Sequence, residues 1–373
     1  MNKQNLNNKI FITLLIIMSS VFLFSMIRNG NYVNVVDNRT SYRFTKPTIK
    51  TLLNGEYQDS MDETIADQMP KYKYFKLLYL KIKNYTNALT IKSLKLDKKN
   101  KYVYLGEPSL YNGYLVFSLS NLDVYETDIT EINKLVDNTN ANIYLYYINT
   151  DTNYNFETGD TLDDVSYLKE RLKVKNIASL DIKDFDEYKD YFYKTDHHWN
   201  YKGSYKGFTD IATLMNLNVP EITNEVCFDS SFYGSKKRDL AGINIINETV
   251  CMYQFDLPKF KIYISGKEEE RYGSSLRELE NKNVIAYGDM YGLDYDEIIF
   301  INNDSTNDKK LLIYSNSFSN SVNKLLAANY KETYVIDGRH YNGESMVDYI
   351  NNHNIDDVLI LANHILFTCE KNW

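Results

Sequence analysis

The chain has 373 residues, of which 43% are hydrophobic and 25% are charged, a mixture typical of a globular protein with a full hydrophobic core. Its formal net charge at pH 7 is -8, and no basic face is evident. Nucleic-acid binding needs a basic surface, so we exclude it as a function of this chain.

The first feature along the chain is an uncharged, apolar run of 18 residues from 10 to 27, preceded by Lys3 and Lys9. Its length is near the lower limit for a helix that crosses a bilayer. A cleaved signal peptide is the alternative, but no small-residue cleavage site follows Ser25. We therefore expect residues 1–28 to be a signal-anchor in the membrane, with the rest of the chain on the extracytoplasmic face.

The remaining chain shows an α/β pattern after an N-terminal extension. We expect residues 29–95 to form the extension, with a helix from Met61 to Asn84, and residues 96–373 to form one α/β domain. Before residue 190, the predicted elements are strands at 101–105, 114–117, 141–148 and up to 181, and helices at 128–137 and 162–172.

The most informative motif is the tetrad from Asp196 to Trp199, which places two of the five histidines beside an acid. In an extended segment, Asp196 and His198 leave on one side, and His197 and Trp199 on the other. A carboxylate can then orient the His198 imidazole as a general base. Two other interpretations stay open: Asp196 caps the helix that follows Tyr201, or the histidines are structural groups.

The segment after this motif is less regular. A helix is predicted from Ser204 to Met215, and residues 221–308 are interpreted as an insertion that carries its own strands. Within it, the charged run 267–271 is interpreted as solvated. Gly288 to Gly292 lacks the glycine spacing of a phosphate-binding loop.

A serine between a predicted strand and a predicted helix is the candidate nucleophile. Residues 309–314 have the pattern of a buried strand, and 318–329 that of a helix. A sharp turn between them lifts the Ser317 hydroxyl above the sheet edge and aims backbone N–H groups at an oxyanion. The alternative is an ordinary turn or N-cap serine. His364, after a last strand at 358–361, is a lesser candidate for the base.

Cysteine and histidine usage argues against a metal or a disulfide framework. Cys227, Cys251 and Cys369 show no metal-ligand spacing, and His197 and His198 lack a partner at helical spacing. A bridge from Cys227 to Cys251 and three free thiols both remain possible. We expect no metal and no cofactor.

Taken together, the motifs resemble the DHHW family and the alginate O-acetylation proteins of the SGNH-hydrolase superfamily, in which an Asp-x-His-Trp motif precedes a Gly-[Asp/Thr]-Ser-[Phe/Tyr] block. The order of these blocks is the same here. Weaker matches lie at Asp37-Asn38-Arg39, Pro47, Gly55, Asp67 to Pro70, Tyr104 to Gly106, Gly113 to Leu115, Phe232 to Ser235 and Ile336 to Tyr341. The resemblance covers most of the chain after residue 35.

The resemblance implies an SGNH-hydrolase-like three-layer fold with a mostly parallel sheet. It also implies a triad of Asp196, His198 and Ser317, with Asn316 and Arg339 on the substrate or the oxyanion. For Arg339, an ion pair with an acid is the alternative. The chain departs from the family at Ser315 and Asn316, where the family has Gly and then Asp or Thr. A serine can replace that glycine only if the backbone avoids a conformation reserved for glycine.

These observations predict a membrane-anchored serine acyl esterase or O-acetyltransferase that acts on a cell-surface or secreted polysaccharide. For acetyl transfer, the resemblance implies a membrane-bound O-acyltransferase as partner. The alternative function is a non-catalytic polysaccharide-binding or scaffolding subunit of a cell-envelope complex, which the departure at Ser315 and Asn316 favours.

Overall fold

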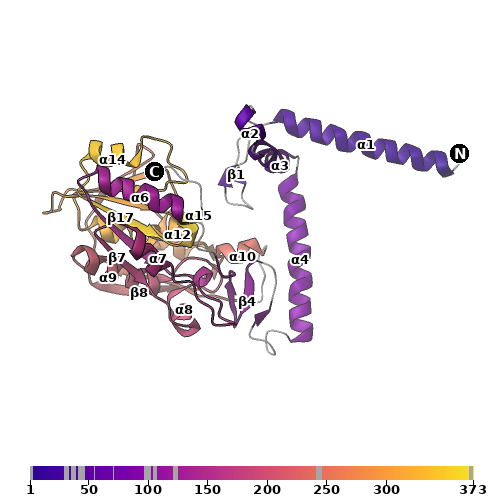
Figure 1. Cartoon of the computed structure of the whole chain (residues 1–373). Coiled ribbons are helices and arrows are strands. Elements are labelled where there is room, and N and C mark those ends of the chain that lie inside the picture. The colour runs from indigo at the N-terminus through magenta and orange to yellow at the C-terminus, as the bar shows by residue number, and fades with distance from the viewer. Residues whose placement is uncertain are drawn as a thin grey trace. The chain divides into compact units, whose positions relative to one another are not determined.

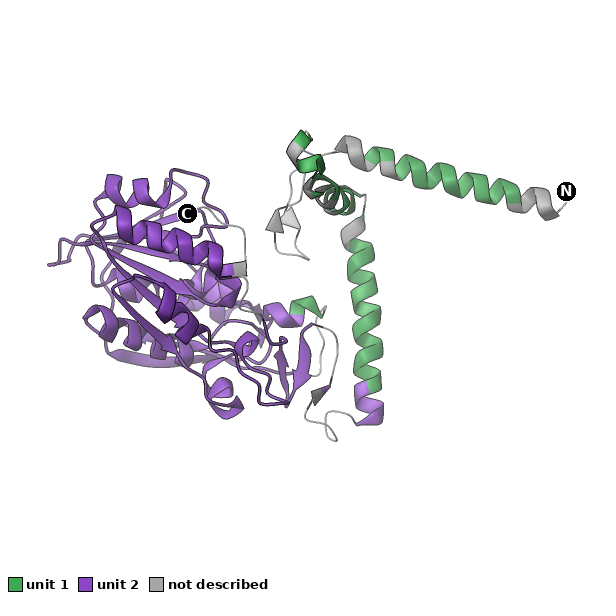
Figure 2. Ribbon diagram, in the orientation of Figure 1, with its two compact units in different colours: residues 1–90, 238–243 green, residues 91–237, 244–373 purple. Residues whose placement is uncertain are grey.

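The structure is a computed structural model. It describes residues 3–28, 33–34, 39–40, 47–53, 55–69, 71–95, 102–103, 107–120, 125–240, 246–368 and 373. The chain divides into two compact units, residues 1–90 with 238–243 and residues 91–237 with 244–373 (Figure 2). Several motif residues, Asp37, Asn38, Pro70, Tyr104 to Gly106 and Cys369, lie outside the described residues.

The first unit is mainly helical. Its elements are α1 (Lys3–Arg28), β1 (Val33–Asn34), β2 (Arg39–Thr40), α2 (Ile49–Leu53), α3 (Glu56–Gln68) and most of α4 (Tyr72–Leu94). Among the described residues, no helix combines the length and the apolar character needed to cross a membrane. The single helix expected from Met61 to Asn84 is divided between α3 and α4. Met69 is extended, as is usual for a residue before proline, and this ends α3.

The second unit is built around a large sheet, two of whose strands, β17 and β7, are labelled in Figure 1. The sheet has eight strands in the order β12-β11-β14-β16-β15-β17-β6-β7. From β16 to β7 the neighbouring strands are parallel, whereas β14, β11 and β12 add an antiparallel edge. The strands are β6 (Asn142–Ile148), β7 (Asn176–Leu180), β11 (Phe260–Ile264), β12 (Lys267–Glu269), β14 (Glu297–Asn302), β15 (Lys310–Ser315), β16 (Glu332–Ile336) and β17 (Asp357–Ala362).

Helices pack on both faces of this sheet, because its central strands are apolar on both faces. In β6, Tyr144 and Tyr146 join one buried cluster, whereas Leu145 and Tyr147 join another. The first cluster includes α9 (Tyr201–Met215) and α13 (Asn323–Ala327); the second includes α6 (Glu126–Asn138), α7 (Asp164–Arg171) and α14 (Met346–His353). The expected three-layer α/β arrangement with a mostly parallel sheet is therefore present.

The segment 221–308, expected as an insertion, supplies β11, β12 and β14 to the edge of the main sheet. It also forms an antiparallel pair of β8 (Ile222–Phe228) and β10 (Val250–Phe255), in which Cys227 and Cys251 are joined by a disulfide bond. The remaining elements of this segment are β9 (Ser231–Phe232), α10 (Ser235–Asp239), α11 (Leu276–Glu280), β13 (Val284–Ile285) and α12 (Tyr287–Tyr291).

Short elements make up the rest of the described fold. They are β3 (Tyr102–Val103), β4 (Ser109–Tyr111), β5 (Tyr114–Val116), η2 (Asp151–Asn153), α8 (Phe185–Tyr191), η3 (Ser317–Ser321) and α15 (His364–Thr368). The carboxyl ends of β6, β17 and β15 meet at one edge, because these strands are parallel neighbours. Ligand sites of parallel α/β folds form at this edge, and the Ser317 turn follows β15 there.

Candidate active site

The Asp196 tetrad lies in a closed loop between α8 and α9. A bridge between Phe192 and Trp199 closes the loop. Asn200 caps α9, since its side chain accepts from the backbone N–H groups of Lys202 and Gly203. Asp196 is therefore not the helix cap, which removes one of the alternative interpretations.

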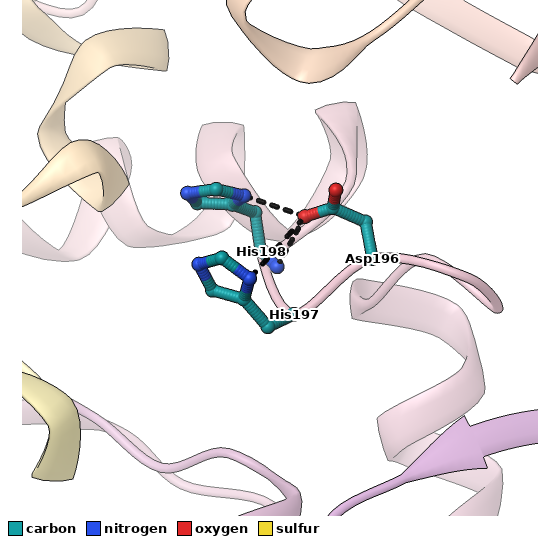
Figure 3. A group of neighbouring side chains, drawn as sticks. All are labelled: Asp196, His197 and His198. Atoms are coloured by element: carbon teal, nitrogen blue, oxygen red, sulfur yellow. Dashed lines mark hydrogen bonds and ion pairs between the residues drawn. The ribbon is translucent and has the colours of Figure 1, made fainter. Parts of the chain in front are cut away.

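Asp196 and His198 are in direct contact. Asp196 Oδ1 accepts hydrogen bonds from His198 N at 2.9 Å and from His198 Nδ1 at 2.5 Å (Figure 3). Both side chains are buried. Burial alone would raise the pKa of Asp196, but the charge and hydrogen bonds of His198, together with His197, hold this pKa well below its ordinary value. Asp196 thus stays ionised, and His198 Nδ1 carries a proton toward it.

His198 also reaches Ser317, which lies 119 residues further along the chain. The distance between His198 Nε2 and Ser317 Oγ is 2.7 Å. Because Nδ1 donates to Asp196, Nε2 of the neutral ring is the acceptor for the serine hydroxyl. The structure thus brings together all three residues of the predicted triad.

The turn before Ser317 does not need a glycine. Ser315, at the family's glycine position, is the last residue of strand β15 and does not have a positive φ. Asn316 has φ -109° and ψ -164°, an extended conformation that any residue adopts. Ser315 is buried, and its Oγ donates to the Leu361 carbonyl at 2.8 Å. The departure from the family pattern at Ser315 and Asn316 is therefore compatible with the turn. The helix predicted from 318 to 329 is instead a 3₁₀ turn, η3, followed by the short α13.

Asn316 stabilises this turn through both ends of its side chain. Its Oδ1 accepts from Phe318 N at 3.2 Å, and its Nδ2 donates to Asn363 Oδ1 at 3.0 Å. The side chain is buried and its amide hydrogen-bonds inside the fold. Its expected role at an oxyanion stays a prediction.

Arg339 forms ion pairs with two acids. Its Nε donates to Asp337 Oδ1 at 2.8 Å, and its Nη2 lies 3.0 Å from Asp294 Oδ2. Asp294 also accepts from Asn320 Nδ2 in η3 at 3.0 Å. The ion pairing considered as the alternative is thus present, and it links Arg339 to the nucleophile segment through Asp294. The substrate or oxyanion role of Arg339 stays a prediction.

His364, the lesser candidate for the base, lies in a different buried cluster. Its Nδ1 is 3.0 Å from Tyr125 Oη, which also hydrogen-bonds Asp164 and Tyr147. Burial lowers the pKa of His364. This placement is that of a neutral structural histidine.

Tyr287 is a site residue that the sequence did not reveal. Its ring lies parallel to the His198 imidazole, with 3.7 Å between the centroids and 1° between the planes. The Phe318 ring is 4.9 Å from the same imidazole. These two rings restrict the rotation of His198, so Tyr287 and Phe318 fix the orientation of its imidazole.

His197 is not on the opposite side from His198, as an extended strand would require. The loop bends at 194–198, and the two imidazole centroids are 3.9 Å apart (Figure 3). His197 Nδ1 lies 2.5 Å from Ser235 Oγ, and Ser235 N donates to Asp196 Oδ2 at 2.7 Å. Ser235 therefore fixes the second carboxylate oxygen of Asp196. Its segment, 232–235, matched the family pattern without an assigned role.

Lys236, the residue next to Ser235, forms a buried ion pair with Asp151. Lys236 and Asp151 are 0% and 1% exposed, and Lys236 Nζ is 2.5 Å from Asp151 Oδ2. The same oxygen accepts from Phe117 N at 2.7 Å, and Tyr188 Oη lies 3.2 Å from Lys236 Nζ. Removing either charge would leave the other buried without an opposite charge, so the ion pair strongly constrains the position of Ser235.

Glu248 holds the start of the tetrad loop. Its carboxylate accepts from Lys194 N at 2.5 Å, from Thr195 N at 3.1 Å and from Thr195 Oγ at 2.7 Å. Burial raises the pKa of Glu248 to about 6, although these hydrogen bonds oppose the rise. Glu248 therefore changes charge near neutral pH while it touches the residues next to Asp196.

Replacing Glu248 with glutamine is expected to change how stability depends on pH. The folded state binds the Glu248 proton more tightly than the unfolded chain, so this stabilisation is complete below pH 4.5 and is lost as the pH rises through about 6. The rise from 4.5 to about 6 corresponds to about 2 kcal/mol. Denaturant unfolding should show the wild type losing about 2 kcal/mol relative to Glu248→Gln between pH 4.5 and 7. Parallel pH profiles would contradict this assignment.

The tetrad could also be a metal site instead of part of a hydrogen-bonded triad. Donor atoms of Asp196, His197 and His198 lie within 4.8 Å of one another. However, both ring nitrogens of His198 are within hydrogen-bond distance of Asp196 and Ser317. A metal on His198 would displace one of these contacts, so the geometry favours the hydrogen-bonded triad.

Known proteins of the same fold were found by structure and not by sequence. No family model matches the sequence, and no curated protein is significantly similar to it. A DHHW family protein from Eubacterium siraeum has a TM-score of 0.59 at 17% identity, over 72% of this chain and 94% of that one. PatB1 from Bacillus cereus, solved with a sulfonyl adduct, has a TM-score of 0.57 at 21% identity, over 70% and 97%.

The O-acetyltransferase domain of Pseudomonas putida AlgJ is also similar in structure, with a TM-score of 0.35 at 8% identity, over 67% of this chain and 85% of that domain. This similarity is too low to support an argument. The first comparison confirms the predicted resemblance to the DHHW family at the level of the fold, and the second shows that PatB1 shares this fold.

Proposed function

We propose that this chain is an extracytoplasmic serine acyl esterase or O-acetyltransferase that modifies a cell-surface or secreted polysaccharide. The observation that carries the proposal is the hydrogen-bonded series Asp196, His198 and Ser317, with distances of 2.5 and 2.7 Å. These are the distances at which an acid-supported imidazole removes a proton from a serine hydroxyl.

The chemistry follows from this geometry. Ser317 Oγ attacks the carbonyl carbon of an acyl donor while His198 Nε2 takes the hydroxyl proton, and ionised Asp196 stabilises the resulting imidazolium. The backbone N–H of Ser317 is the proposed donor to the oxyanion. When the tetrahedral intermediate collapses, the leaving group takes the proton from His198, and the acyl group remains as an ester on Ser317. A sugar hydroxyl or water then accepts the acyl group by the reverse sequence.

Two further points support acyl chemistry at this serine. PatB1, which shares the fold, was solved with a sulfonyl adduct, and sulfonyl groups react with activated nucleophiles. In addition, the turn at Ser315 and Asn316, the sequence feature that favoured a non-catalytic subunit, has an ordinary backbone. For acetyl transfer, we propose a membrane-bound O-acyltransferase as the source of the acyl group.

Covalent labelling tests the proposed nucleophile. A fluorophosphonate or sulfonyl fluoride probe should label the folded full-length chain, and mass spectrometry should place the label on the peptide that contains Ser317. Ser166→Ala is a suitable control, because Ser166 is exposed on α7, and the hydrogen bond that caps this helix uses the backbone N–H of Ser166 and not its hydroxyl. This variant should label normally. A folded wild-type chain that takes no label would point to the polysaccharide-binding or scaffolding subunit.

The membrane anchor is also a proposal. It is supported by the uncharged run 10–27, whose side chains include Phe11, Ile16 and Met18, exposed by 62%, 60% and 68%. We expect the full-length chain to stay with membranes in alkaline carbonate and to need detergent for release, whereas a chain that starts at residue 30 should be soluble. Release of the full-length chain by carbonate alone would contradict the anchor.

A further inference from the structure

A pocket of about 360 Å³ lies beside the proposed active site. Its walls are provided by α9, by the β8 and β10 pair, and by the segment that runs from η3 into α13. Sites for small ligands start at about 300 Å³, so this pocket can hold a small ligand. The disulfide bond between Cys227 and Cys251 joins the two strands of one wall.

Aromatic rings form much of the pocket lining. The Tyr253 ring contacts Tyr201 edge to face at 4.7 Å and Tyr205 at 5.6 Å, and Phe255 stacks on Tyr205 at 5.7 Å. Rings that combine an apolar face with a polar edge suit the two-sided surface of a sugar, whose C–H groups stack on the faces while its hydroxyls reach polar groups. Gln254 also lines the pocket and supplies an amide for such a hydroxyl.

Lys324 is the only charged residue among the described residues that line this pocket. Its Nζ donates to the Tyr272 carbonyl at 2.7 Å, and no carboxylate in the described part of the chain pairs with it. Lys324 is half-buried, and this burial lowers the pKa of its ammonium. An ammonium in that situation is stabilised by an anionic ligand.

The pocket is one side-chain layer away from the proposed triad, by two routes. Ser321 lines the pocket, and its Oγ accepts from the Nε1 of Trp199 at 2.9 Å, next to His198. Tyr291 also lines it, and its ring is 4.9 Å from the Tyr287 ring that stacks on His198. A ligand in this pocket is therefore held one side chain away from His198.

We propose that this pocket binds a unit of an anionic saccharide, with the rings of Tyr201, Tyr205 and Tyr253 against the sugar and Lys324 on its anionic group. The inference deepens the proposed function and rests on it, because the saccharide can act as the acyl acceptor only if Ser317 carries out the proposed acyl transfer. Glu225 accepts from Tyr201 Oη at 2.7 Å, so the anionic group is expected at Lys324 and away from this carboxylate.

Calorimetry on the full-length chain in detergent tests the inference, with tetragalacturonate as the anionic probe and its full methyl ester as the neutral probe of equal length. We expect the wild type to bind the anionic probe at least about tenfold more tightly, the range for one charge-assisted contact. Lys324→Met should remove this preference and leave the neutral probe unchanged, whereas Lys324→Arg should retain it. Tyr253→Ala should weaken both probes.

Lys175→Met is the matched control, because Lys175 Nζ donates to Asn142 Oδ1 at the start of β6, the opposite end from the triad. It should leave both affinities unchanged. The inference would be overturned if the wild type bound the two probes equally, or if Lys324→Met kept the preference for the anionic probe. It would also be overturned if the wild type bound neither probe.

Labelling of Ser317 in the same samples separates this inference from the proposed function. Normal labelling without an anionic preference would overturn the pocket assignment alone. An anionic preference that depends on Lys324 in a chain whose serine takes no label would retain the pocket and overturn acyl transfer.

Discussion

Replacing Asp196 with asparagine is expected to slow the acylation of Ser317 by about 10³- to 10⁴-fold while the fold is retained. An asparagine amide can donate to His198 Nδ1, where the carboxylate only accepts. The ring would then carry its proton on Nε2 and could not accept from the Ser317 hydroxyl, which lies 2.7 Å away. The rate of labelling by a fluorophosphonate probe measures this effect directly, and Ser317→Ala should abolish labelling.

The neighbouring histidines provide the sharpest control for this prediction. His198→Ala should match Ser317→Ala, because it removes the base. His197→Ala should keep labelling within about tenfold of wild type, because His197 contacts Ser235 and the edge of Asp196 instead of the serine. Equal losses in the two histidine variants would contradict the triad. Recovery of labelling on addition of a divalent metal would favour the metal arrangement of Asp196, His197 and His198.

The two parts of the candidate triad could each be predicted from the sequence, because each part has a local signature. The two-residue spacing of Asp196 and His198 and the serine between a buried strand and an apolar segment are patterns that depend on neighbours in the chain. The contact between the two parts was predicted only through the family resemblance. It depends on the parallel order of β15, β17 and β6, which periodicity alone does not set.

The residues that support the triad could not be predicted in the same way. Tyr287, Ser235 and Glu248 come from the segment 221–308, which lacks a clear period. Tyr287 and Ser235 contact the tetrad, and Glu248 contacts the two residues before it, from 38 to 89 residues away. His197 was misplaced for a related reason. The expectation that side chains alternate in direction assumes an extended strand. Hydrogen bonds from the backbone of Lys194 and Thr195 to Glu248 instead hold the loop in a bend. Tertiary contacts thus decide the direction of His197.

Gly234 is the position where the smallest change is expected to disturb the site most. A Cβ at this residue would lie 2.1 Å from the Thr195 carbonyl oxygen and 2.6 Å from Asp196 N. Both are backbone atoms of the tetrad loop, which Glu248 and Ser235 hold on either side, so they cannot move without displacing Asp196. Gly234→Ala is therefore expected to lower the free energy of unfolding by about 3 kcal/mol and the rate of Ser317 labelling by about 100-fold.

Gly288→Ala is the control for Gly234→Ala, because it also adds one methyl group but does not place it against the backbone of the tetrad loop. Its Cβ would meet Leu293 Cδ2 at 2.7 Å, the mobile end of an exposed side chain, and alanine is favoured within α12. Denaturant unfolding and probe labelling should both stay near wild type in this variant, although Gly288 directly follows Tyr287, the residue that stacks on His198. If Gly234→Ala were equally mild, the backbone approach of Gly234 to Thr195 would not be what positions Asp196, and the ion pair of Lys236 with Asp151 would have to hold that loop by itself.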